Sequence, residues 1–158
     1  MRYLAVDAAP TLPRRVRATP ELHAATEAAI AKWNAIRPGT FELVPWHAPA
    51  AVDVVPSMTR TWVSFVEPWP RAVVLCGPDL ADWLPHEMGH ALGLADHVPP
   101  EMVEPGHVNP VIADDSNPYW GVMRYWTRLD QWFGPDDVAM MNEVFPLAHR
   151  VVLPGVAS

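Results

Sequence analysis

The sequence HEMGHALGLADH, at residues 86–97, holds three histidines and two acidic residues. We expect a helix through His86 and His90, because residues four apart in a helix project from the same face. Both imidazoles can then bind one metal ion, with each nitrogen about 2.0 Å from a zinc. Glu87 follows the first histidine, so its carboxylate can reach a water held by the metal and act as a base. The segment therefore predicts a metal centre with a general base beside it.

The third ligand is expected in the turn that follows the helix. Gly93 can adopt the left-handed conformation that ends a helix, which brings the residue three positions later back toward the metal. That residue is Asp96, and its neighbour His97 is also of a type that binds zinc. The offset from Gly93 favours Asp96, with His97 as the alternative third ligand.

Patterns on both sides of this segment predict an α+β fold. Five runs alternate as strands do: Arg2–Val6, Phe41–Trp46, Ala51–Val55, Thr61–Glu67 and Arg71–Cys76. Helices are expected over Pro20–Ile36, over Trp83–Leu92, and from Asp136 or Asp137 to Phe145. The stretch between the last two helices is rich in Pro, Asp and Asn, which indicates an irregular segment with a function. Within it, His107, Asp114 and Asp115 loosely suggest a metal site, but we expect a solvated loop.

The composition is that of one folded domain, which we expect to span residues 1–158. Half of the residues are apolar and 18% are charged, so an intrinsically disordered chain is excluded. The net charge is −7 and there is no basic stripe, which argues against nucleic acid as a partner. Cys76 is the single cysteine, so packing or a metal must hold the fold in place of an internal disulfide.

The sequence predicts no association with a membrane. It has no run of about 18 apolar residues, and its first residues lack the pattern of an export signal. A cytoplasmic location is therefore the default expectation, with secretion by another route left open.

HEMGHALGLAD resembles the extended zinc motif of the metzincin metallopeptidases. Its form, HExxHxxGxxD, is typical of the small bacterial snapalysins, in which aspartate is the third ligand. Downstream, the sequence GVMRY at residues 121–125 is similar to the Ser-x-Met-x-Tyr turn of astacins and serralysins, with a match at Met123 and Tyr125. Gly121 stands where that pattern has serine. The resemblance implies a structural methionine turn at Met123 beneath the metal, and Tyr125 as a hydrogen-bond donor to an oxyanion.

The resemblance also implies an architecture. It is that of a metzincin-like zincin: a twisted five-stranded mixed sheet with two long helices, then an irregular C-terminal subdomain that ends in a helix. Weaker similarity to matrixins covers residues 29–33, 41–43 and 51–54, and the segment from Asp136 to Phe145. Only a few residues separate the expected strands between Thr61 and Cys76. The calcium-binding loop of matrixins is therefore missing, and we expect one catalytic zinc ion and no structural calcium.

The function implied is that of a monomeric zinc endopeptidase with Glu87 as general base. An extended peptide or protein substrate would add a strand to an edge such as Thr61–Glu67. Two alternatives stay open: a catalytically silent zinc-binding interaction module, and a dedicated protease with a single protein target. Glu87 favours an enzyme over the silent module, because a structural zinc site has four protein ligands and no use for an adjacent base.

Overall fold

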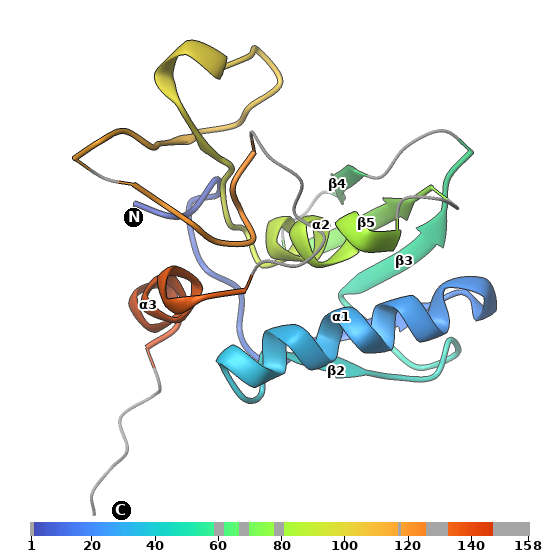
Figure 1. The fold of residues 1–158 in the computed structure, drawn as a ribbon. Helices are drawn as coiled ribbons and strands as arrows, with labels where there is room; N and C mark the ends of the chain where they lie inside the picture. Colours follow the sequence, from blue (N-terminus) through green and yellow to red (C-terminus); the bar gives the residue numbers. More distant parts are fainter. Residues whose placement is uncertain are drawn as a thin grey trace, which may run out of the picture.

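The computed structural model describes residues 2–58, 62–66, 70–77, 81–116, 118–125 and 133–146. Its centre is a five-stranded sheet in the order β2-β1-β3-β5-β4 (Figure 1). The strands are β1 (Arg14–Ala18), β2 (Phe41–Leu43), β3 (Val52–Pro56), β4 (Trp62–Val66) and β5 (Arg71–Cys76). Four of them run parallel, and β4 pairs antiparallel with β5 at one edge. The predicted α+β class and the mixed five-stranded sheet are confirmed.

Two helices cover the sheet beside each other (Figure 1). α1 (His23–Ile36) lies against β2, and α2 (Leu84–Ala91) lies against β4 and β5. The fully buried Trp33 joins the two helices, because its indole Nε1 donates a hydrogen bond of 2.8 Å to the carbonyl of Pro85. A 3₁₀ turn, η1 (Pro20–Leu22), precedes α1. The expectation of two long helices is wrong for α2, which has 8 residues against 14 in α1.

The predicted first strand is wrong. Arg2–Val6 lies outside the main sheet, and β1 (Arg14–Ala18) takes its place. The buried Arg14 donates from Nη2 and Nε to the carbonyl of Ala91, at 2.9 and 3.2 Å. Hydrogen bonds to the end of α2 thus make it possible to bury an arginine in a strand. Burial also lowers the pKa of this arginine to about 10.

The first residues of the chain instead clamp the turn after α2. Leu4 forms a β-bridge with Leu94, where Ala5 N–H donates to Gly93 O at 2.8 Å. On the other side of the bridge, Ala95 N–H donates to Tyr3 O at 2.9 Å. The N-terminal segment therefore supports the turn that leads to Asp96.

The described residues between α2 and the last helix are largely irregular, as expected (Figure 1, yellow to orange). β6 (His97–Val98) pairs with β7 (Val111–Ile112), and a 3₁₀ turn, η3 (Pro100–Met102), lies between them. A second short 3₁₀ turn, η2 (Ala81–Trp83), leads into α2. α3 (Pro135–Val144) agrees with the predicted last helix to within about one residue at each end. No helix in the described ranges is both long and apolar enough to cross a membrane.

Candidate metal centre

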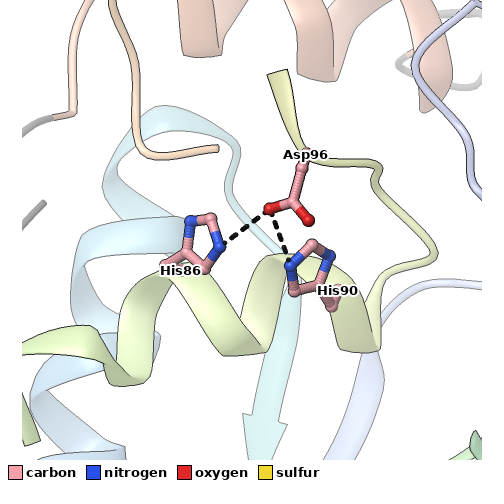
Figure 2. A group of neighbouring side chains, drawn as sticks. All are labelled: His86, His90 and Asp96. Atoms are coloured by element: carbon pink, nitrogen blue, oxygen red, sulfur yellow. Dashed lines mark ion pairs between the residues drawn. The ribbon is translucent and has the colours of Figure 1, made fainter. Parts of the chain in front are cut away.

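The side chains of His86 and His90, on α2, and of Asp96, after the helix, point toward one another (Figure 2). One ligand atom from each lies within 4.8 Å of the other two. Asp96 Oδ1 is 3.1 Å from His86 Nε2 and 3.2 Å from His90 Nε2. A tetrahedral zinc with bonds of about 2.0–2.1 Å separates its ligand atoms by about 3.3 Å. Both distances from Asp96 Oδ1 are close to that value, and the three residues could together hold a metal ion.

Backbone carbonyls set the orientation of both imidazoles. His86 Nδ1 lies 2.8 Å from Val122 O, and His90 Nδ1 lies 2.8 Å from Leu94 O. A carbonyl only accepts hydrogen bonds, so Nδ1 of each neutral ring carries the proton. Both Nε2 lone pairs then face Asp96, which is the arrangement of metal-binding histidines.

The electrostatics of the cluster also favour a cation. Asp96 Oδ1 is buried and has no hydrogen bond of acceptable geometry in the described part of the chain. Lone pairs that converge on one point repel one another unless a cation or a proton lies between them. Burial opposes ionisation of Asp96, yet the nearby His86 and His90 hold its pKa well below the ordinary range. Burial likewise opposes the charged form of His90, but Asp96 and Glu87 raise its pKa to about 9.

The turn at Gly93 brings the chain back so that Asp96 lies beside His86 and His90 of α2. Gly93 has a φ of +86°, a conformation that residues with a side chain rarely adopt. Leu94 N–H donates to Gly89 O at 3.1 Å and Gly93 N–H to His90 O at 2.8 Å, which ends the helix. The predicted role of Gly93 as the helix-ending turn is confirmed.

Glu87 lies on the same helix, next to His86, and is partly buried. Burial raises the pKa of its carboxyl group, and the charge of Asp96 adds to this. His86 and His90 act in the opposite direction. No described residue donates a hydrogen bond to this carboxylate, so both of its oxygens remain free to take up a proton.

Met123 is fully buried under α2. A Cβ atom on Gly89 would collide with its sulfur, so the helix approaches this methionine as closely as a glycine allows. The backbone of the turn is fixed by His97, whose N–H donates to Met123 O at 2.9 Å. His97 O in turn accepts from Tyr125 N–H at 3.0 Å. The segment predicted as a methionine turn therefore lies directly beside the candidate metal centre.

His97, the alternative third ligand, lies outside the cluster. Its side chain is 1% exposed and packs between Tyr3, at 5.4 Å between ring centroids, and Tyr119, at 3.7 Å. Neither ring nitrogen has a hydrogen-bond partner among the described residues. Burial lowers the pKa of His97 to about 3, against the opposing charge of Asp96. The geometry therefore selects Asp96 over His97.

The hydroxyl of Tyr125, the predicted oxyanion donor, contacts an acidic side chain in the structure. Its hydroxyl donates to Glu104 Oε2 at 3.3 Å. Burial, together with that carboxylate, raises the pKa of Tyr125. A phenol has one proton to donate, so Tyr125 must leave Glu104 before it can serve an oxyanion.

Sequence reasoning missed His107, which it assigned to a solvated loop. Its Nε2 lies 4.0 Å from Asp96 Oδ2, and its side chain is 5% exposed. No spacing connects His107 to the motif, so only the path of the loop could reveal this contact. Asp114, from the same predicted group, is exposed and instead accepts hydrogen bonds from Ser116.

A scan against models of known protein families found no match, and neither did a search of curated proteins. The likeness to metzincins therefore rests on the residues quoted above.

Proposed function

We propose that this protein is a zinc-dependent endopeptidase. The observation that carries the proposal is the position of Glu87, one residue after His86, with a carboxylate that no described residue hydrogen-bonds. A zinc ion held by His86, His90 and Asp96 would acidify a water and polarise the carbonyl of the scissile bond. Glu87 accepts a proton from the attacking water and passes it to the leaving nitrogen, so that one water is consumed for each C–N bond broken.

The environment of Glu87 suits this exchange. A general base works best when its pKa lies near the working pH, because it must both accept and return a proton. Burial raises the pKa of Glu87 toward that range. The carboxylate is placed by the helix, since residues 86 and 87 point to adjacent sides of the same turn.

The substrate in this proposal is an extended peptide that pairs with β4. Among the described residues β4 pairs with β5 alone, and its other edge would accept a further strand. β4 also lies against α2, the helix that carries both histidines. Backbone pairing positions a chain of any sequence, so side-chain pockets must set the preference. One copy of the chain supplies every proposed group, consistent with a monomer.

The test is a paired measurement on the full chain. Bound zinc is determined by elemental analysis, and cleavage by mass spectrometry of a mixed peptide library. We expect Glu87→Gln to keep wild-type zinc content and to lose about 100-fold or more in cleavage, because the amide cannot take a proton. Glu27→Gln is the matched control, because Glu27 is exposed on α1, and it should leave both measurements unchanged.

Two outcomes would replace the proposal. Wild-type protein that binds zinc and leaves every peptide intact would favour the silent zinc-binding module. Cleavage of one library sequence, and of no other, would identify a dedicated protease. Equal cleavage by the wild type and Glu87→Gln would remove Glu87 from the mechanism.

A further inference from the structure

His107 differs from the two helical histidines in its backbone partner. Its Nδ1 accepts a hydrogen bond of 2.9 Å from the N–H of Glu104. An N–H only donates, so Nδ1 of His107 keeps its lone pair and the neutral ring carries its proton on Nε2. The rings of His86 and His90 have the reverse tautomer, because carbonyls face their Nδ1 atoms. When the rings are neutral, as metal binding requires, two imidazoles therefore turn Nε2 lone pairs toward Asp96, and His107 turns an N–H toward it.

The loop that carries His107 approaches Asp96 at two points. It runs from residue 99 to residue 110 between β6 and β7, and most of its residues are exposed. His107 is turned inward, with its ring packed edge-on against Tyr125 at 4.3 Å between centroids. At the end of the loop, Val111 N–H donates to Asp96 O at 2.8 Å. Backbone and side chain of the loop therefore both converge on the same residue.

We propose that His107 is a positioning residue of the metal centre, acting through Asp96. Its Nε2–H faces Asp96 Oδ2 at 4.0 Å, while Oδ1 faces the two ligand histidines. A small rotation of the carboxylate, or one bridging water, converts this contact into a hydrogen bond. An N–H held against Oδ2 keeps Oδ1 turned toward the metal and restricts Asp96 to binding through one oxygen.

The same tautomer excludes His107 as a fourth ligand. Binding through Nε2 would move the proton to Nδ1, where it would point at the N–H of Glu104. Consistent with this, His107 is not part of the group whose ligand atoms lie within 4.8 Å of one another in the described ranges. In this proposal His107 therefore does not occupy a coordination position of the metal. The inference rests on the metal centre of the proposed function, and it does not require peptide cleavage.

The experiment measures zinc dissociation constants by competition with a chromophoric chelator. His107→Phe keeps a ring against Tyr125 and removes the N–H, and we expect zinc to bind about 10- to 100-fold more weakly. His107→Gln places an amide N–H near the position of Nε2 and should bind within a few-fold of the wild type. His107→Asn places its amide near Nδ1 and should behave like the phenylalanine variant. His47→Phe, at an exposed histidine, is the control and should have no effect.

X-ray absorption of the zinc-loaded wild type gives a second, independent readout, for which we expect two imidazole ligands. Three imidazoles in the wild type and two in His107→Phe would make His107 a ligand and overturn the inference. Equal zinc affinity of the wild type and His107→Phe would also overturn it. If His107→Phe fails to fold in circular dichroism, the pair of His107→Gln and His107→Asn decides between the outcomes. If the wild-type protein binds no zinc, both the proposed metal centre and the inference about His107 are wrong. If His107→Phe binds zinc more weakly and the wild type cleaves no peptide, the inference about His107 holds and the proposed peptidase function is wrong.

Discussion

Asp96 and His97 are adjacent in the chain, but their side chains lie in different surroundings. Asp96 faces the imidazoles of α2, and His97 is packed between two tyrosine rings. Successive side chains of an extended segment point in opposite directions, and β6 begins at His97. The spacing of the helical histidines was sufficient to predict that His86 and His90 lie in one cluster. The third member of the cluster was open because the sequence did not show that the chain becomes extended after Gly93.

Acid should destabilise the protein through His97. Its pKa is about 3 in the folded state and about 6.5 in an unfolded chain. Between these values the unfolded state binds the proton and the folded state does not, so stability falls as the pH falls below about 6.5. From pH 7 to pH 5 the free energy of unfolding should drop by about 2 kcal/mol through this residue.

His97→Phe, which keeps an aromatic ring between the tyrosines and removes the titrating group, should remove that part of the pH dependence and leave zinc binding unchanged. Urea unfolding of both zinc-free proteins at pH 7 and pH 5 measures the difference, in which the contributions of other groups cancel. The same acid loss in both proteins would contradict the prediction. If the His97→Phe protein no longer bound zinc, His97 would again be a candidate for the third ligand.

At the scale of elements, one buried polar side chain and one distant pairing partner account for the two errors at the first strand. The segment RRVRA of β1 reads as polar, because the sequence gives no sign that Arg14 is buried on the carbonyl of Ala91. The alternation in Arg2–Val6 is that of a strand, but its partner is the turn at Leu94 rather than the sheet. The helices were easier to predict, since caps and apolar spacing are local features. Contacts between distant segments leave no such local pattern.

The turn at residues 121–125 shows why glycine stands where the metzincin pattern has serine. A Cβ atom on Gly121 would collide with Asp137 and with the ring of Tyr119. Asp137 Oδ1 accepts from Val122 N–H at 3.0 Å, and Val122 O faces His86 Nδ1. Asp137 on α3 therefore holds the backbone that orients a ligand histidine. Burial raises the pKa of Asp137 to about 6, although the hydrogen bonds from Tyr119 and the backbone oppose this.

Gly121→Ala should accordingly destabilise the fold by about 1–3 kcal/mol, the usual cost of overpacking. Gly106→Ala is the matched control, because nothing lies within 4 Å of the added Cβ there, and it should change stability by about 0.5 kcal/mol or less. Urea midpoints of the two variants provide the comparison. A Gly121→Ala midpoint equal to that of Gly106→Ala would show that the turn adapts more easily than its contacts indicate.

At the scale of the whole molecule, zinc and protons should compete for the same centre. His90 is protonated at neutral pH when its pKa is about 9, and a metal binds only the neutral ring. Zinc binding at pH 7.5 should therefore release about one proton, and zinc affinity should fall about tenfold per pH unit between pH 8 and pH 6. Calorimetry in two buffers with different ionisation enthalpies measures the release. Identical heats in both buffers would contradict the prediction, and Asp96→Asn, which lacks the carboxylate that raises the pKa of His90, should release less.

The hydrogen bonds between residues 3–5 and residues 93–95 connect two segments that are far apart in the sequence, and this affects when during folding the metal centre can form. During synthesis, Tyr3 and Ala5 are made long before Gly93 and Ala95, so the hydrogen bonds between these two segments cannot form until residues 93–95 have been added. Contacts between residues far apart in the sequence tend to form late in folding. Bringing the two segments together costs conformational entropy of the intervening chain before the contacts contribute favourable free energy. We therefore expect the cluster of His86, His90 and Asp96 to take its final geometry late in folding, so that a nascent chain does not yet hold the proposed centre.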